Sequence, residues 1–208
     1  MLISEIKYLD KGKYSVILDN DEEILLYRSE IKDLGLEEGF TLTEELYEHI
    51  IVDVLGLRAK KRAMHILEKR DKTEKQLRDK LTENHYPQKS IDIAIDYVKS
   101  FKYLDDERYC YNYISYRIEK KSFQKLKAEL MTKGISKELI DETYEELYQS
   151  SYTENQILGL LQKKRYNDYS DDKDKRRKII QSILRKGYTF SQIKAVIDCN
   201  DLSQDIEY

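Results

Sequence analysis

The sequence has no tryptophan, one proline and only seven glycines in 208 residues. Proline disrupts helix interiors and glycine marks turns, so their scarcity favours a helix-rich fold. No apolar run approaches the ~20 residues that a membrane-spanning helix requires. The first residues lack a basic start followed by an apolar stretch, and Cys110 and Cys199 show no paired spacing. We therefore expect a cytoplasmic protein with reduced thiols.

Recognised catalytic motifs are also lacking. There is no Walker-type glycine-rich loop, no G-x-S-x-G and no H-E-x-x-H. The three histidines, at positions 49, 65 and 85, have no metal-ligand spacing. The sequence predicts a protein that is not an enzyme and that uses no cofactor and no metal.

Charge is abundant and unevenly distributed, since charged residues make up 37% of the chain. Residues 1–57 carry 5 basic and 14 acidic side chains, whereas residues 58–208 carry 32 basic and 26 acidic ones. This asymmetry predicts a boundary near Gly56, with a basic surface beyond it.

The first 57 residues are expected to form a small strand module. The stretches LISEIKY, YSVILD and EEILLY alternate as strands do, and DNDE at 19–22 is a hairpin turn signal. Such a small meander needs a helix on one face. Residues 29–36 and 42–56 could supply it, the second beginning after Thr43.

After Gly56 the spacing becomes helical and the pattern occurs three times, with the first set of positions 47 residues apart. The first set recurs at i, i+3, i+4 and i+7: Ala63, Ile66, Leu67 and Arg70; Cys110, Tyr113, Ile114 and Arg117; Ile157, Leu160, Leu161 and Lys164. A second set follows in each unit: Leu77, Leu81, Tyr86, Ile91 and Ile95; Leu126, Leu130, Ile135, Ile140 and Tyr144; Ile179, Ile183, Tyr188, Ile193 and Ile197. The two sets predict helical core faces in three tandem units.

The turns between the last two helices of each unit also correspond. We expect helix C-caps at Asn84, Gly134 and Gly187. The next helices are expected to start at Pro87, Ser136 and Thr189.

The predicted fold is therefore mainly α, with tandem three-helix repeats after a small N-terminal β-strand module. We expect the three repeats to stack into an elongated, curved array. Residues 167–175 are expected to form a mobile loop. The predicted divisions are 1–57, 58–103, 105–149, 153–198 and a C-terminal tail at 199–208.

Three consecutive acids occur in the stretch KYLDDERYC at 102–110. A metal site there is disfavoured, because no histidine lies nearby. Asp105 is a good N-cap, and Asp106 and Glu107 would then occupy the first helical turn, where the helix dipole favours negative charge. The acids are therefore interpreted as the start of a helix.

The same stretch, YLDDERY, followed by EL-x-x-KGI at 129–135, resembles the RecX family of bacterial recombination regulators. Tyr109–Cys110 stands where that family usually has Phe–Ala, and the third unit matches least well. The resemblance implies a monomer that binds the RecA recombinase filament, with DNA inside it, and modulates or inhibits ATPase and strand-exchange activity in DNA repair and the SOS response. The motif residues are expected to be mainly structural: Tyr103, Leu104, Asp105, Asp106, Glu107, Arg108, Tyr109, Leu130, Gly134 and Ile135.

Positive charge gathers in equivalent parts of the three units, with net charges of +5 over 58–86, +4 over 117–133 and +6 over 162–187. Such clusters can be solvated faces, but their recurrence favours binding to phosphates or to an acidic protein surface. The candidate contact residues are Lys60, Lys61, Arg62, Arg70, Lys75, Arg78, Arg117, Lys120, Lys121, Lys125, Lys127, Lys163, Lys164, Arg165, Arg176, Arg177 and Lys178. Tyr111, Tyr116, Tyr166 and Tyr169 could stack on bases or cover the core.

Two other functions remain open from the residues alone. Short three-helix units resemble helix-turn-helix folds, which would suit a protein that binds nucleic acid directly. A helical adaptor for an unrelated protein is the other alternative.

Overall fold

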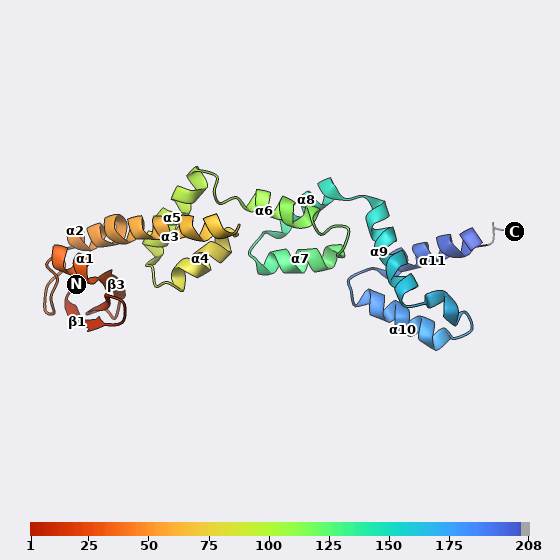
Figure 1. Cartoon of the computed structure of the whole chain (residues 1–208), viewed down its shortest axis with the longest axis horizontal. Helices are drawn as coiled ribbons and strands as arrows, with labels where there is room; N and C mark the ends of the chain where they lie inside the picture. Colours follow the sequence, from red (N-terminus) through yellow and green to blue (C-terminus); the bar gives the residue numbers. More distant parts are fainter. Residues whose placement is uncertain (205–208) are drawn as a thin grey trace. The chain divides into compact units, whose positions relative to one another are not determined.

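The structure, a computed structural model, describes residues 1–204 and the side chains of residues 1–199 (Figure 1). It is 63% helical, with a three-stranded antiparallel sheet at the N-terminus, as predicted. The chain divides into two compact units, Met1–Asp105 and the part that begins at Asp106.

The sheet consists of β1 (Ile3–Tyr8), β2 (Lys13–Leu18) and β3 (Glu23–Tyr27), in that order. Their buried side chains include Ile3, Val16, Leu18, Ile24 and Leu26. The DNDE hairpin is confirmed, since Asp21 has a φ of 63° and the Glu22 amide donates to Asn20 Oδ1. Alternation in the sequence thus places one apolar face of the sheet against the helices that follow.

Those helices are α1 (Arg28–Asp33), α2 (Glu44–His49), the π-helical segment η1 (Ile50–Leu55) and α3 (Gly56–Lys69). Thr43 caps α2 as predicted, because its side chain accepts a hydrogen bond from the Leu46 amide. The chain stays helical from α2 through α3, so Gly56 lies inside a continuous helix. The change of charge and periodicity near Gly56 coincides with no break in the backbone.

The N-terminal module packs directly on the first repeat. Ser90 Oγ donates to the Ile51 carbonyl over 2.7 Å, and Arg58 Nη2 donates to the Leu25 carbonyl over 2.6 Å. Lys89 also forms an ion pair with Glu48. The module and the first repeat therefore belong to one compact unit, Met1–Asp105.

Each repeat contains three main helices around a small core. The first has α3, α4 (Glu74–Thr82) and α5 (Gln88–Ser100). The second has α6 (Asp106–Ser115), α7 (Phe123–Thr132) and α8 (Lys137–Leu147). The third has α9 (Ser150–Lys163), α10 (Lys173–Leu184) and α11 (Phe190–Gln204).

The predicted repeat positions form these cores. Leu77 and Leu81 are buried in the first repeat, Leu126 and Leu130 in the second, and Ile183 in the third. The last position of the first set lies outside the core in all three repeats, since Arg70 is exposed and Arg117 and Lys164 are half-buried charged side chains. Each of the three clusters consists of residues from a single repeat.

The helix caps follow the prediction at all but one position. Gly134 and Gly187 have φ values of 91° and 92°, as a left-handed C-cap requires. In the first repeat the left-handed residue is His85, with a φ of 59°, so the prediction of Asn84 was wrong by one residue. Asn84 instead donates from its side chain to the Lys80 carbonyl.

The next helices begin where predicted. Pro87 and Ser136 are the N-caps of α5 and α8, and Ser136 Oγ accepts from the Leu139 amide. Thr189 precedes α11 and exchanges two hydrogen bonds with Gln192. This reciprocal pair satisfies amides that would otherwise be left free at the helix start.

Residues 167–175, which were expected to form a mobile loop, instead contain parts of two helices. A 3-10 helix, η2 (Tyr166–Tyr169), anchors it through the buried Tyr166, and α10 begins at Lys173 after the Asp172 cap. The expected tail is also shorter, because α11 continues to Gln204. The remaining predicted tail residues, 205–208, lie outside the described residues.

Polar contacts join the second and third repeats. Gln156 Nε2 donates to the Ile118 carbonyl, and Tyr188 Oη donates to Gln156 Oε1 over 2.8 Å. Ser122 Oγ donates to the Lys186 carbonyl, next to Gly187. A Cβ at Gly187 would lie 2.8 Å from Gln124 Cβ, so glycine is required there by space as well as by its positive φ.

Candidate interaction surface

The YLDDERY stretch spans the division between the compact units. Leu104 is buried in the core of the first repeat, and Tyr109 packs on the core of the second. Asp106 and Glu107 occupy the first turn of α6, as predicted. Tyr103 and Arg108 are exposed. Leu130 and Ile135 are buried at the end of α7 and after its turn, and Gly134 in the turn between them is exposed.

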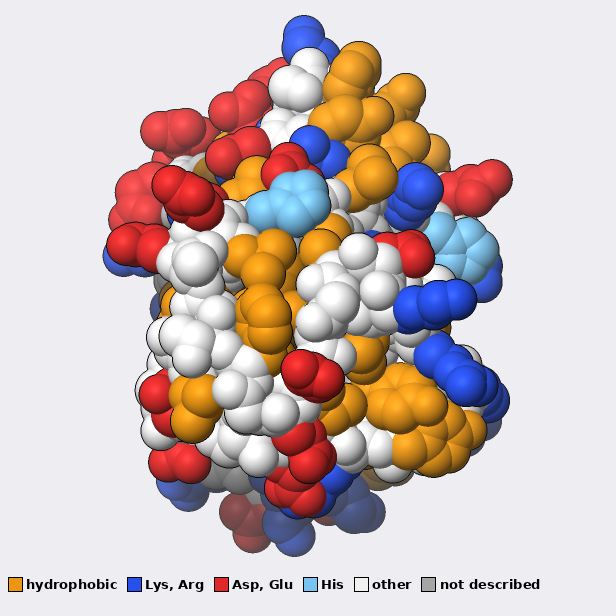
Figure 2. All heavy atoms as spheres, turned by 90° about the vertical axis from the view of Figure 1, so that its left-hand side faces the viewer, with side chains coloured by type: hydrophobic (Ala, Val, Ile, Leu, Met, Phe, Trp, Pro, Cys, Tyr) orange, Lys and Arg blue, Asp and Glu red, His pale blue; other side chains and the backbone are white. Residues whose placement is uncertain are grey.

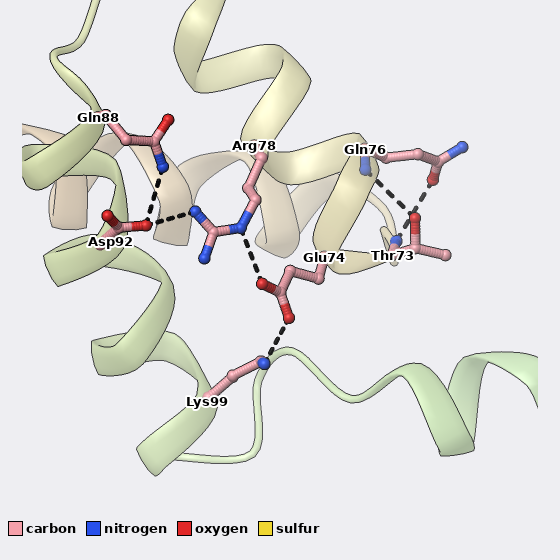
Figure 3. A network of polar contacts seen from close by, with 7 residues as sticks. All are labelled: Thr73, Glu74, Gln76, Arg78, Gln88, Asp92 and Lys99. Carbon is pink, nitrogen blue, oxygen red and sulfur yellow. Dashed lines mark hydrogen bonds and ion pairs between the residues drawn. The ribbon is translucent and has the colours of Figure 1, made fainter. Parts of the chain in front are cut away.

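Several candidate contact residues have partners inside their own repeat. Arg78 lies between two carboxylates, with Nε 2.8 Å from Glu74 Oε1 and Nη1 2.6 Å from Asp92 Oδ1 (Figure 3). Lys99 forms an ion pair with Glu74, and Gln88 donates to Asp92. The network joins α4 to α5, so Arg78 stabilises the repeat.

The network also changes the acidity of its members. Burial alone would raise the pKa of Glu74, but hydrogen bonds from Lys99 and Arg78 outweigh it and lower that pKa. The hydrogen bond from Arg78 is the main cause that lowers the pKa of Asp92. Both carboxylates are thus held ionised.

An equivalent ion pair occurs in the second repeat, where Lys127 on α7 contacts Asp141 on α8. Both pairs join residues 14 apart, at matching positions of the repeat. The third repeat has Ile180 and Lys194 at these positions, so the pair is absent there. The charge pattern of the sequence made Arg78 and Lys127 candidates for binding a partner. In the structure each forms an ion pair with a carboxylate of its own repeat.

Five further candidates contact neighbouring side chains. The Arg117 guanidinium carbon lies 4.0 Å from the centroid of the Tyr113 ring, and Lys121 Nζ lies 2.6 Å from Glu129 Oε2. Burial and a hydrogen bond to Glu129 raise the pKa of Tyr113 to about 12. The other three contacts are Lys60 with Tyr97, Lys75 with Asp79 and Arg176 with Tyr166.

The remaining ten candidates form no ion pair among the described residues, and most are exposed. They are Lys61, Arg62, Arg70, Lys120, Lys125, Lys163, Lys164, Arg165, Arg177 and Lys178. All three repeats contribute to this set, which we call the unpaired basic set. Figure 2 views the molecule from its N-terminal end, where acidic side chains gather at the upper left and several Lys and Arg side chains lie along the right edge, with others at the top and bottom.

The four tyrosines near these clusters differ in their exposure. Tyr116 is 76% exposed and Tyr111 43% exposed, so both could meet a ligand. Tyr166 is only 6% exposed and belongs to the core of the third repeat. Base stacking by Tyr166 is therefore excluded in this fold.

Two other kinds of site do not occur in the described part of the chain. No group of three or more His, Cys, Asp or Glu side chains could hold a metal ion there. Nor is any helix within residues 1–204 long and apolar enough to cross a membrane.

These features define a protein of three tandem three-helix repeats that follow a small antiparallel sheet. Models of the first, second and third three-helix domains of RecX match residues 59–97, 105–143 and 153–197 in that order. The chain belongs to the RecX family. A protein named regulatory protein RecX from Clostridium acetobutylicum is 33% identical over 193 residues, which cover 90% of this chain and 89% of that protein. The one from Clostridium tetani is 32% identical over 202 residues, with coverages of 93% and 91%.

Solved structures share the fold. A crystal structure of regulatory protein RecX superposes with a TM-score of 0.63 at 22% identity, covering 95% of this chain and 98% of the other. The RecX structure from Lactobacillus salivarius gives a TM-score of 0.65 at 22% identity, covering 72% and 99%. Sheet and repeats thus have the architecture of a regulatory protein family.

Proposed function

We propose that this protein regulates homologous recombination by binding the RecA recombinase filament on DNA. The protein occupies the filament groove and contacts more than one recombinase subunit. In that position it slows ATP hydrolysis and hinders strand exchange. The observation that carries the proposal is the match of all three repeats to the domains of a regulatory family.

The unpaired basic set supports a charged partner. A cation already paired with a carboxylate gains little from a new partner, because the first ion pair must be given up. The ten unpaired side chains include Lys120 and Lys125 in the second repeat and Arg177 and Lys178 in the third. DNA phosphates and acidic surfaces of the recombinase are the partners that such side chains would bind.

Repetition extends this interaction. Three domains of the same kind, each with unpaired cations, can engage successive subunits of a helical filament, and linked domains bind more tightly than any one of them. A bridge between subunits would oppose both filament growth and entry of a second DNA strand. Inhibition is therefore the expected direction of regulation.

The test is the rate of ATP hydrolysis by RecA on single-stranded DNA, with this protein added below stoichiometric amounts. We expect the wild type to lower the rate and the Lys120→Gln/Lys125→Gln variant to lower it less. The matched control is Lys137→Gln/Lys194→Gln, which removes two exposed cations from the same compact unit but outside the candidate set. An unchanged rate with the wild type, together with no association by sedimentation, would overturn the proposal.

The same preparations distinguish direct action on nucleic acid. Tight binding to DNA without recombinase, with a steep dependence on salt, would favour a DNA-binding protein over a filament regulator. Binding to DNA that is weak without the recombinase and much tighter with it supports the proposal.

A further inference from the structure

A cavity lies between the N-terminal module and the first repeat. Its volume is about 270 Å³. Three parts of the chain line it: the edge of the sheet, the start of α3 and the turn after α4. The lining residues are Lys13, Leu25, Tyr27, Leu55, Arg58, Arg62, Asn84, His85 and Tyr86.

The charge of this cavity is unusual for its surroundings. The lining contains the cations Lys13, Arg58 and Arg62 and no carboxylate. The N-terminal module around it is strongly acidic, with 14 Asp and Glu against 5 Lys and Arg in residues 1–57. Arg58 is paired with Glu30 beside the lining, whereas Lys13 and Arg62 form no ion pair within the described residues, so an anion between these two cations would be attracted by both.

Arg58 is fixed at the wall of the cavity. Its Nη2 donates to the Leu25 carbonyl, and its Nη1 lies 3.4 Å from Glu30 Oε2. The guanidinium carbon lies 4.8 Å from the centroid of the Tyr27 ring and 6.0 Å from that of Tyr86. A further donor of this guanidinium, Nε, is buried and has no hydrogen-bond partner. An unsatisfied buried donor is unfavourable unless something binds it.

Arg62 and Lys13 are free to move toward a ligand. Arg62 lies one helical turn after Arg58, on the same face of α3, and neither Arg62 nor Lys13 forms an ion pair within the described residues. Burial raises the pKa of Tyr86, whereas the charges of Arg58 and Arg62 act in the opposite direction. Arg58 and Arg62 both line the cavity beside Tyr86, and the charge of Glu30 acts there in the opposite sense to theirs.

We infer that this cavity binds a phosphate group of a single-stranded nucleic acid, with the neighbouring nucleotide against the tyrosines. Convergent cations suit the phosphate, and Tyr27, which is 36% exposed, offers an aromatic face to the base. An acidic peptide would use the cations but leave the aromatic faces unused. Of the lining residues only Arg62 belongs to the unpaired basic set, and the inference does not require the recombinase.

The test measures the binding of a fluorescent oligothymidine to the full chain, without recombinase, over a range of salt. The Lys13→Gln/Arg62→Gln variant should bind more weakly, with a salt slope lower by about 0.7 for each phosphate that the variant no longer neutralises. If the variant loses one phosphate contact, the ratio of the wild-type binding constant to that of the variant should fall about 2.6-fold as salt is raised from about 50 to about 200 mM. The control Lys32→Gln/Lys69→Gln removes two exposed cations of the same unit that do not line the cavity.

A second measurement observes Arg58 directly, without substituting it. The Arg58 Nε–H resonance of nitrogen-15-labelled protein should shift when the oligothymidine is added, and it should shift less in the Lys13→Gln/Arg62→Gln variant. Inorganic phosphate at the same concentration should cause a smaller shift. The inference is overturned if the variant binds like wild type at all salt concentrations, if wild type binds no strand at low salt, or if an acidic peptide binds as tightly as the strand. Failure of the ATP hydrolysis test leaves this result unaffected.

Discussion

The core of the second repeat supplies the sharpest stability prediction. Leu130 is 0% exposed and packs among the buried residues of α6, α7 and α8. Leu130→Ala removes apolar carbons worth about 2.4 kcal/mol of transfer free energy and leaves a cavity, so the free energy of unfolding should fall by about 3 kcal/mol. For a unit of this size the melting temperature should fall by about 12 to 24 °C.

The effect should be confined to the compact unit that contains Leu130. Each core cluster lies within one unit, so hydrogen exchange measured by mass spectrometry should accelerate in peptides after Asp106 and not in Met1–Asp105. Met131→Ala is the control, because Met131 is the next residue on α7 and is 51% exposed. A loss below about 0.5 kcal/mol for Leu130→Ala would refute the assignment of this core.

Three further predictions concern single side chains. Gly187→Ala should lower the free energy of unfolding, measured by urea titration, by more than about 1 kcal/mol. Gly159→Ala, in open space on α9, should raise it by up to about 1 kcal/mol. A more stable Gly187→Ala than Gly159→Ala would contradict the assigned backbone. Arg78→Met should lose about 1 kcal/mol at neutral pH, because its ion pairs are partly exposed. Arg78 helps to lower the pKa values of Glu74 and Asp92, so these ion pairs stabilise the protein above the unfolded pKa values of the two carboxyls, which are near 4. The stability lost in Arg78→Met should therefore shrink as the pH falls through the lower pKa values of the folded state. A loss that does not change with pH would contradict the network. Cys199, which is exposed, should react with a thiol reagent in the folded protein; buried Cys110, whose pKa burial raises, should react only after unfolding, and equal rates would contradict its burial.

Local patterns in the sequence predicted most of the fold. Alternation located the three strands, and the two recurring sets of apolar positions located the cores of the three-helix domains. The C-cap after α4, which was predicted at the wrong residue, shows what such patterns fail to locate. Glycine, and less often asparagine, is the residue type expected in the left-handed conformation at a helix end. In the first repeat this conformation belongs to His85 instead, a residue type that rarely predicts it.

The interaction surface was less predictable, because side-chain pairing depends on the packing of helices. Arg78 and Lys127 look like their exposed neighbours in the sequence, yet both pair across to the third helix of their repeat. Tyr166 lies in a polar stretch, and only the packing of the third repeat shows that it is buried. The cavity around Arg58 combines residues as far apart as Lys13 and Tyr86, which no local pattern could bring together.

Electron microscopy of RecA filaments on single-stranded DNA, with and without this protein, tests the central claim most directly. We predict additional density along the filament groove that touches more than one recombinase subunit. The Lys120→Gln/Lys125→Gln variant should show weaker density, and the Lys137→Gln/Lys194→Gln control should match the wild type. Filaments that stay bare at saturating concentrations of the wild-type protein would contradict the account.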